Sequence, residues 1–265
     1  MHNAAYAALG LNWRYLAFEV DPTNLRAAIE GARAMNFAGL NLTVPHKLLA
    51  VDMVDEMDAS AKIWGAVNTI KFVAGPDGKI RAIGFNTDAD GLVDSLRADL
   101  KLELRGAKVL LLGAGGAGRT AALKLAAENV AELFLVNRTS AKAEEIAGEI
   151  KKQFPSVKVF TRYPKAEVDL VLNATSLGLK TDDDSPLAAH QFSLIQARTA
   201  YDMIYSPAET AFLHAAKIAG CQTANGIGML AGQGARAFEL WTGLPAPAAV
   251  MRQAVEQSVY GAATS

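Results

Sequence analysis

Cysteine is nearly absent from this chain, and long apolar runs are missing. The 265 residues include one cysteine, Cys221, so no disulfide can form within the chain and a reducing compartment is favoured. The four histidines are scattered without metal-ligand spacing, so no metal site is expected. No apolar stretch approaches the roughly 20 residues that a membrane helix needs. These absences argue against a disulfide scaffold and a membrane-spanning protein, and they favour a cytoplasmic location.

An excess of charge of one sign is also lacking. Lysine and arginine total 26 and aspartate and glutamate total 27, which leaves a formal net charge of −1. This balance cannot supply the basic field that duplex nucleic acid requires, so neither nucleic acid nor a membrane is expected as a partner. Hydrophobic residues make up 51% and charged residues 20%, which is typical of a folded globular chain. A small-molecule ligand remains the expected partner.

Short apolar runs alternate with alanine-rich stretches along most of the chain. This alternation predicts an α/β fold with mainly parallel sheets covered on both faces by helices. The expected strands are 14–20, 38–44, 66–73, 79–85, 108–112, 132–136, 157–160, 169–172 and 200–205, and the expected helices are 24–35, 46–56, 89–100, 117–128, 141–154 and 209–219. Turn chemistry at Gly75-Pro-Asp-Gly78 predicts an antiparallel hairpin between two of these strands.

A domain boundary is predicted near Asp88, where one set of strands ends and a helix leads to a fresh start at Lys108. Residues 1–88 would form a first domain, and residues 89–225 a second. The segment 226–265 has helical pattern only, and we expect it to fold back on the first domain and complete it. The expected result is two lobes with a ligand cleft between them.

A glycine-rich turn directly follows the apolar run 108–112. Its sequence is Gly113-Ala-Gly115-Gly-Ala-Gly118, and an alanine-rich helical stretch begins there. In this strand–turn–helix context, Gly113 permits the tight turn, Gly115 lets the backbone approach a pyrophosphate, and Gly118 allows close packing of helix on strand. The free N–H groups of the helix start would face the phosphates. The pattern predicts a Rossmann dinucleotide-binding domain.

The next strand, 132–136, indicates which dinucleotide is bound. An NAD site usually has a carboxylate at this strand end, where it accepts from the ribose 2′-hydroxyl. Here Asn137, Arg138 and Thr139 follow the strand, and Lys142 comes soon after. A guanidinium at that place can pair with a 2′-phosphate. The substitution favours NADP over NAD, although Arg138 could also be a solvated surface charge.

Lys47 and Asp88 are the candidates for proton transfer. Each follows a strand that runs into a helix, which is the end of an α/β sheet where ligands bind. Pro45 occupies a plausible first helical position, so Lys47 falls in the first turn, where a cation opposes the helix dipole. An ordinary surface lysine and an N-capping aspartate are the competing interpretations.

Eight segments occur in one order along the chain: Asn41–Lys47, Gly65–Thr69, Phe85–Asp88, Gly113–Gly118, Asn137–Thr139, Asn173–Thr175, Tyr201–Tyr205 and Gly226–Gln233. In this combination, the sequence resembles the shikimate dehydrogenase family over essentially its whole length. The resemblance implies an N-terminal α/β substrate domain, a Rossmann NADP-binding domain, and C-terminal helices that return to the first domain. It also implies reduction of the C3 ketone of 3-dehydroshikimate to shikimate by NADPH, a step toward aromatic amino acids.

The resemblance also assigns residues to roles. It implies that Lys47 and Asp88 are the catalytic pair. It implies substrate contacts from Thr43, Asn68, Tyr205 and Gln233. It implies NADP contacts from Gly113, Ala114, Gly115, Gly116, Ala117, Gly118, Asn137, Arg138, Thr139, Lys142, Thr175, Met203 and Gly226, with Met203 and Gly226 on the nicotinamide side.

The chain departs from the family at its start. Family members have a strand and a Ser-x-Ser-Pro turn, whose serines hold the substrate carboxylate, before the segment that is Met1-His2-Asn3 here. The resemblance therefore implies an N-terminus shortened relative to the family. Two alternatives stay open: a quinate/shikimate dehydrogenase using NAD or NADP, and a non-catalytic NADP-binding protein that lacks the strand and serines. The sequence does not distinguish a monomer from a homodimer.

Overall fold

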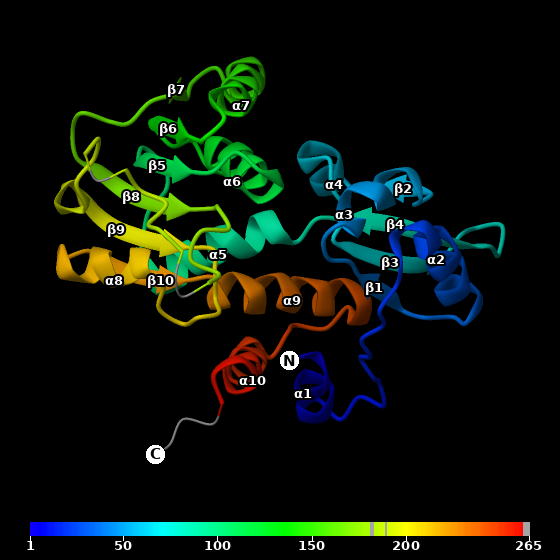
Figure 1. The fold of residues 1–265 in the computed structure, drawn as a ribbon. Coiled ribbons are helices and arrows are strands. Elements are labelled where there is room, and N and C mark those ends of the chain that lie inside the picture. Colours follow the sequence, from blue (N-terminus) through cyan, green and yellow to red (C-terminus); the bar gives the residue numbers. More distant parts are fainter. Residues whose placement is uncertain (181–182, 189, 262–265) are drawn as a thin grey trace. The chain divides into compact units, whose positions relative to one another are not determined.

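Two β-sheets organise the chain in the computed structural model, which describes residues 1–180, 183–188 and 190–261 (Figure 1). Each sheet belongs to one of two compact units. The first unit contains Met1–Gly91 and Ala231–Val255, and the second contains Leu92–Leu230 and Glu256–Ser265. Residues 226–230 and 256–260 therefore cluster with the second unit, whereas the sequence assigned 226–265 to the first domain. Their hydrogen bonds explain the difference, because Gly226 N donates to Ile204 O and Tyr260 Oη donates to Tyr205 O.

The first unit contains a four-stranded mixed sheet in the order β1-β3-β4-β2. The strands are β1 (Gly39–Asn41), β2 (Glu56–Met57), β3 (Thr69–Ala74) and β4 (Ile80–Phe85). β3 is antiparallel to both β1 and β4, and β2 is parallel to β4. The predicted hairpin is confirmed, since β3 and β4 pair across the Gly75–Gly78 turn. β1, β2 and β4 run in one direction, so their carboxyl ends meet at one edge of the sheet.

Helices of the first unit pack around this sheet and beside it. They are α1 (His2–Ala8), η1 (Pro22–Asn24), α2 (Leu25–Ala34), α3 (His46–Leu49), η2 (Ala50–Asp52) and α4 (Ala59–Trp64). α2 and the sheet share a buried core of Leu25, Ile29, Ala50, Ala61, Val67, Ile70 and Ala82. The predicted helix 46–56 is shorter than expected, because η2 and then β2 take over after Leu49.

Three of the described helices contribute residues to both units. They are α5 (Asp88–Leu100), α9 (Ile227–Thr242) and α10 (Ala248–Tyr260). Within the first unit, α1, α9 and α10 share a separate core built on Ala5, Tyr6, Phe238 and Met251. Among the described helices, none has both the length and the apolarity needed to cross a bilayer.

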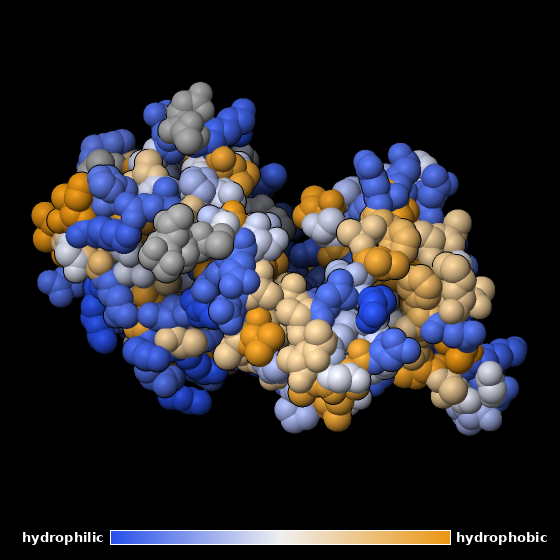
Figure 2. Space-filling view, turned by 90° about the horizontal axis from the view of Figure 1, so that it is seen from below, coloured by the Kyte–Doolittle hydropathy of each residue, from blue (hydrophilic) through white to orange (hydrophobic). Residues whose placement is uncertain are grey.

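The strand predicted over 14–20 is absent, and this expectation is wrong. Residues 12–20 have no regular structure, and Leu16 and Phe18 are 64% and 62% exposed. A strand is stabilised by a hydrogen-bonded neighbour, and none of the described strands pairs with this segment. Apolar residues also gather on the surface of this unit in the view of Figure 2. The segment therefore has the alternating apolar pattern of a strand but lacks the hydrogen bonds to a neighbouring strand.

The second unit contains a six-stranded parallel sheet in the order β10-β9-β8-β5-β6-β7. The strands are β5 (Lys108–Leu112), β6 (Glu132–Val136), β7 (Lys158–Phe160), β8 (Val168–Asn173), β9 (Ala197–Asp202) and β10 (Gln222–Asn225). Helices α6 (Gly116–Ala127), α7 (Ser140–Gln153) and α8 (Ala211–Ile218) and the short η3 (Leu194–Gln196) connect them. This order, with the first strand central, is the doubly wound arrangement of dinucleotide-binding domains. The predicted Rossmann fold is confirmed.

The strand predicted over 200–205 begins and ends earlier, as β9 at Ala197–Asp202, and β10 was not predicted. β9 ends at Asp202, whose Oδ1 accepts a hydrogen bond from Ile204 N. This bond holds the chain in a turn, so the strand does not continue to residue 205. β10 is polar, and pairing with β9 rather than apolar character makes it a strand.

His2 anchors α1 against α9 within the first unit. Its ring is 3% exposed, stacks on Tyr15 with a centroid distance of 4.4 Å, and donates from Nε2 to Gly234 O at 3.1 Å. Burial, with a smaller contribution from the positive charge of the amino terminus, lowers the pKa of His2 to about 4. The ring is therefore neutral in the folded protein at neutral pH.

We expect acid to destabilise the protein through His2. The folded pKa lies below the unfolded value of about 6.5, so protons bind the unfolded chain more tightly. The stabilising effect is complete above pH about 6.5 and is lost as the pH falls toward 4, with about 2 kcal/mol lost at pH about 5. Urea unfolding of wild type and His2→Gln at neutral pH and at that lower pH measures the loss, which the variant should lack.

The matched control for this prediction is His190→Gln, because His190 is an exposed histidine of the second unit. Its replacement should leave the acid destabilisation unchanged. Equal acid sensitivity of the His2→Gln variant and wild type would show that the buried ring is not the responsible group.

Candidate functional site

Lys47 and Asp88 form an ion pair in the first unit. Lys47 lies on α3 just after β1, and Asp88 is the first residue of α5, just after β4. Lys47 Nζ lies 2.8 Å from Asp88 Oδ2, and the two side chains are 27% and 17% exposed. The pair is therefore held in place yet reachable from solvent. An ammonium group at such a place can donate a hydrogen bond and a proton to a ligand oxygen.

Asn86 caps α5, a role for which Asp88 was the sequence candidate. Asn86 Oδ1 accepts from Asp88 N at 3.1 Å and from Ala89 N at 3.4 Å. The amide side chain is 3% exposed and is itself held by donation from Nδ2 to Ala66 O. Since Asn86 satisfies the helix start, the carboxylate of Asp88 is available to Lys47. The N-cap interpretation of Asp88 is therefore wrong.

Asn68 fixes the residue that precedes Asp88. Its Oδ1 accepts from Thr87 N at 2.8 Å, and its Nδ2 donates to Thr87 Oγ1 at 3.0 Å. Asn68 is 2% exposed, so its amide orientation is set by Thr87 and Thr69 before any ligand arrives. This predicted substrate residue thus holds the backbone that precedes Asp88, and it stands just before β3, at the same edge of the sheet.

Backbone hydrogen bonds join the loops that carry Thr43, Lys47 and Asn68. Leu42 N donates to Asn68 O at 2.7 Å, and Val67 N donates to Lys47 O at 2.8 Å. Thr43 is exposed, and its carbonyl accepts from His46 N at the start of α3. Pro45 is the N-cap of α3, whereas the sequence placed it at the first helical position. Three of the predicted site residues therefore share one edge of the first sheet with Asp88.

α9 brings Gln233 to the same part of the first unit. A Cβ placed on Gly232 would lie 3.3 Å from Gly91 Cα, so the two helices approach closely at these glycines. Gln233 follows Gly232 directly, and Gly91 stands in the first turn of α5 after Asp88. Arg236, on the next turn of α9, pairs with Asp90 at 3.7 Å. The close approach brings the segment of α9 that carries Gln233 near the first turn of α5.

The glycine-rich turn of the second unit has the geometry of a phosphate cradle. Gly113 has φ +105°, and a Cβ there would lie 2.9 Å from Ala174 O. α6 begins at Gly116 with Gly115 as its N-cap, and no side chain caps it. Cβ atoms on Gly115 or Gly116 would meet nothing within 4 Å. The backbone at these two glycines is therefore open on the Cβ side, and a helix start without a side-chain cap fits a pyrophosphate.

Asn137 connects this turn to the end of β6. Its Oδ1 accepts from Ala114 N at 3.0 Å, and its Nδ2 donates to Thr139 O at 2.9 Å. Beyond it, Arg138, Thr139 and Lys142 are exposed. In the described part of the chain, neither Arg138 nor Lys142 forms an ion pair, and no side chain caps α7 after Thr139. Two cations and a helix start are thus available to an anion.

The predicted coenzyme residues Thr175, Met203 and Gly226 lie at the carboxyl ends of β8, β9 and β10. Thr175 Oγ1 donates to Asn173 Oδ1 at 2.7 Å, and Met203 N donates to Asn173 O at 3.0 Å. Gly226 packs on the backbone of Met203 so closely that any Cβ there would overlap Met203 O. Tyr205, assigned to the substrate by the resemblance, follows in the same loop of the second unit and is 39% exposed.

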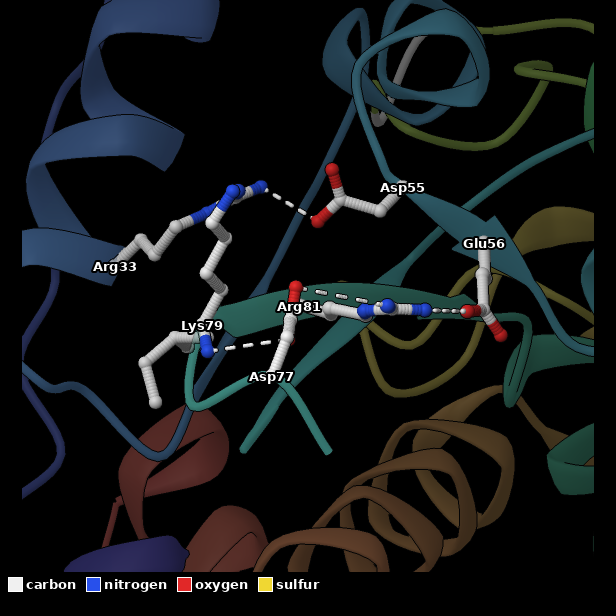
Figure 3. Close-up of a pocket in the computed structure, with 7 residues that line it drawn as sticks. Arg33, Asp55, Glu56, Asp77, Lys79 and Arg81 are labelled. Carbon is white, nitrogen blue, oxygen red and sulfur yellow. Dashed lines mark hydrogen bonds and ion pairs between the residues drawn. The ribbon is translucent and has the colours of Figure 1, made fainter. Parts of the chain in front are cut away.

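A pocket at the opposite end of β4 has a different character (Figure 3). It is lined by Arg33, Asp55, Glu56, Asp77, Lys79, Ile80 and Arg81. Arg33 pairs with Asp55 at 2.8 Å, and Arg81 pairs with Glu56 at 3.1 Å. Three cations and three carboxylates line this pocket, so it offers no excess charge to a ligand. No group of three or more potential metal ligands occurs among the described residues.

Comparison with known proteins identifies the family. The model for "Shikimate dehydrogenase substrate binding domain" matches residues 1–70, that for "Shikimate / quinate 5-dehydrogenase" matches residues 96–181, and that for "Shikimate 5'-dehydrogenase C-terminal domain" matches residues 226–256. The shikimate dehydrogenase (NADP(+)) of Methanopyrus kandleri is 41% identical over 263 residues, 96% of this chain and 89% of that protein. The chain belongs to the shikimate dehydrogenase family.

Solved structures agree with this membership of the shikimate dehydrogenase family. Shikimate 5-dehydrogenase from Thermus thermophilus, in complex with NADP(H) and shikimate, has a TM-score of 0.83 and 36% identity, covering 97% of this chain and 92% of that one. The 5-ketofructose reductase of a Gluconobacter species has a TM-score of 0.84 and 34% identity, covering 97% and 91%. The fold thus serves reductases with more than one named substrate, and the substrate must be argued from the site.

Sequence reasoning assigned no role to Asn86, Asn173 or Asp202. Each was inside a quoted segment, but nothing in the sequence shows that its side chain is buried and bonded across the fold. The only sequence signal for such a side chain is a polar residue at the point where a buried strand meets a loop.

Proposed function

We propose that this protein reduces 3-dehydroshikimate to shikimate with NADPH, reversibly. The Lys47–Asp88 ion pair carries the proposal, because an oriented ammonium group at the edge of the first sheet, in a member of the shikimate dehydrogenase family, supports proton donation. NADPH, when bound, supplies a hydride to a carbonyl carbon. The residues of this chain must then bind the substrate and provide the accompanying proton.

Lys47 is the proposed proton donor. As hydride reaches the carbonyl carbon, negative charge develops on the oxygen, and the ammonium group stabilises that charge and transfers a proton to it. Asp88 Oδ2, 2.8 Å from Lys47 Nζ, fixes the direction of the ammonium group. In the reverse direction, neutral Lys47 accepts the proton of the alcohol.

Four polar residues are the proposed substrate contacts. Thr43, Asn68 and Gln233 belong to the first unit, as the ion pair does, and Tyr205 belongs to the second. Their hydroxyl and amide groups would bind ring hydroxyls. A site that hydrogen-bonds hydroxyl groups rejects analogues without them by a factor of roughly 10⁴ or more, since its own polar groups would lose their partners.

The second unit is proposed to bind NADP. The Gly113–Gly118 turn and the start of α6 would hold the pyrophosphate. Asn137 would hold the turn against the end of β6 through its bond from Ala114 N. Arg138 and Lys142, exposed at the end of β6, would bind the 2′-phosphate. Thr175, Met203 and Gly226 would line the nicotinamide end.

Turnover assays test the function directly. The purified protein is incubated with shikimate or quinate and either NADP or NAD, and reduced coenzyme is followed by absorbance; reduction of 5-ketofructose by NADPH is measured in parallel. We expect shikimate with NADP to give the highest kcat/KM. Preference for quinate or 5-ketofructose would replace the proposed substrate, and NADPH binding without any turnover would favour the non-catalytic alternative.

A further inference from the structure

A buried carboxylate with no cationic partner stands at the carboxyl end of β9. Asp202 is 0% exposed, and among the described residues no lysine, arginine or histidine forms an ion pair with it. Three donors converge on it instead. Asn173 Nδ2 and Ile204 N each donate to Oδ1 at 3.0 Å, and Thr210 Oγ1 donates to Oδ2 at 2.7 Å.

Burial and hydrogen bonding act on this carboxyl group in opposite directions. Burial raises the pKa of Asp202, and the bonds from Thr210, Ile204 and Asn173 act in the opposite direction. An ionised carboxyl group accepts on both oxygens, and here all the partners are donors. A strand end that needed only stability would gain as much from an apolar side chain, because a buried charge carries a desolvation cost that hydrogen bonds only partly offset.

Asn173, at the end of the neighbouring strand β8, extends the network. Its Nδ2 donates to Asp202 Oδ1 and to Leu177 O, which orients the amide so that Oδ1 points to the next loop. Oδ1 then accepts from Thr175 N at 3.0 Å and from Thr175 Oγ1 at 2.7 Å. The Asp202 carboxylate thus sets the orientation of an amide that holds Thr175.

The same pair controls the other two residues of the nicotinamide end. Asp202 Oδ1 binds Ile204 N, which fixes the turn containing Met203, and Met203 N donates to Asn173 O. Gly226 is held on this turn by donation from its N to Ile204 O. The side-chain pair thus bonds directly to Thr175 and to Ile204, and backbone bonds connect Met203 and Gly226 to the same two strand ends.

We propose that Asp202 is a positioning residue for the nicotinamide end of the coenzyme, acting through Asn173 and the Met203–Ile204 turn. The assignment rests on the proposed NADP-binding function. We expect it to concern mainly one end of the coenzyme, because the hydrogen bonds of the network reach neither the Gly113–Gly118 turn nor Arg138. Thr175 approaches that turn only through its methyl group, since a Cβ on Gly113 would lie 3.0 Å from Thr175 Cγ2. This asymmetry makes it testable.

The test compares two ligands that share the adenine end. NADPH has both ends, whereas adenosine 2′,5′-bisphosphate has the 2′-phosphate and no nicotinamide. The dissociation constants of both are measured by calorimetry for wild type, Asp202→Ala and Asp202→Asn, together with Tm and kcat for shikimate oxidation. The control is Thr199→Val. Thr199 is a buried residue of β9 toward its other end, and its Oγ1 donates to Asp169 O at 2.6 Å.

For Asp202→Ala we expect NADPH to bind about ten-fold or more weakly, which corresponds to about 1.4 kcal/mol, and kcat to fall. The bisphosphate should bind within about two-fold of wild type. Asp202→Asn keeps an acceptor for Asn173 and Ile204 and loses only the acceptor for Thr210, so a smaller loss of NADPH affinity, about three-fold, is expected. Thr199→Val should lower Tm and leave both affinities unchanged.

A parallel loss of both affinities in Asp202→Ala, or no loss at all, would overturn the positioning role and leave the proposed function standing. If Asp202→Ala does not fold, Asp202→Asn decides by the same comparison, since only a loss confined to NADPH supports the role. Wild-type protein that binds neither ligand would overturn the proposed function, and the role of Asp202 with it.

Discussion

Replacing Lys47 by methionine is expected to lower kcat for shikimate oxidation by a factor of roughly 10² to 10⁴, the range typical of a lost general acid–base group. Methionine keeps much of the side-chain volume and removes the ammonium group that contacts Asp88 Oδ2 at 2.8 Å. The dissociation constant for NADPH should stay within about two-fold of wild type, because the proposed coenzyme residues belong to the second unit. Steady-state kinetics and calorimetry measure the two quantities.

Two variants make this prediction specific. Lys62→Met removes an exposed lysine from α4 of the same unit and should leave kcat unchanged. Asp88→Asn retains a polar partner for Lys47 but removes the charge, so kcat should fall less than in Lys47→Met. Turnover of Lys47→Met at the wild-type rate would exclude Lys47 as the proton donor and require another group.

The capping of α5 by Asn86 explains why Asp88 is suited to this task. A carboxylate at a helix start ordinarily binds the free backbone N–H groups, and such bonds would turn Asp88 inward. Asn86 takes that place, and Asn68 holds the intervening Thr87 by its backbone and its hydroxyl. Neutral side chains thus satisfy the helix start, and the charge of Asp88 is directed toward Lys47.

The second sheet was predictable from sequence because its central strands are buried on both faces. Lys108–Leu112 and Glu132–Val136 have the predicted bounds, since continuous apolar runs between turn residues leave little ambiguity. β10 escaped prediction because Gln222–Asn225 is polar, and only its pairing with β9 makes it a strand. The strand prediction for 14–20 was wrong for the opposite reason, because the alternating pattern was present but no neighbouring strand pairs with the segment.

For the candidate site, the sequence indicated which helices and strands carry the site residues, but it did not indicate the hydrogen bonds between their side chains. Lys47 and Asp88 could be brought together in advance because both follow strands that lead into helices. The hydrogen bonds of Asn86 and Asp202 could not be predicted from the sequence. Burial and the orientation of an amide depend on residues far away in the chain, such as Ala66 and Asn173. The functional roles of the predicted residues stay predictions until turnover is measured.

Arg138→Ala is expected to weaken NADP binding by roughly ten- to hundred-fold, which corresponds to the loss of charge-assisted hydrogen bonds of about 1.5–3 kcal/mol. Arg138 is exposed at the end of β6 and, in the part of the chain that the structure describes, forms no ion pair. Its guanidinium is therefore available to the 2′-phosphate without first breaking an internal bond. NAD lacks that phosphate, so its affinity should stay within about two-fold, and the preference for NADP should fall by the same factor as its affinity.

The control for Arg138 is Arg198→Ala, because Arg198 is an exposed arginine of β9 in the same unit, 3.8 Å from Asp169. This change should leave the affinities for both coenzymes unaltered. Added salt provides an independent check: it should weaken NADP binding to wild type more than to Arg138→Ala, because a contact between exposed charges is screened. Equal losses for NADP and NAD in Arg138→Ala would mean that Arg138 contacts a part common to both coenzymes, and Lys142 would then be the remaining candidate for the 2′-phosphate.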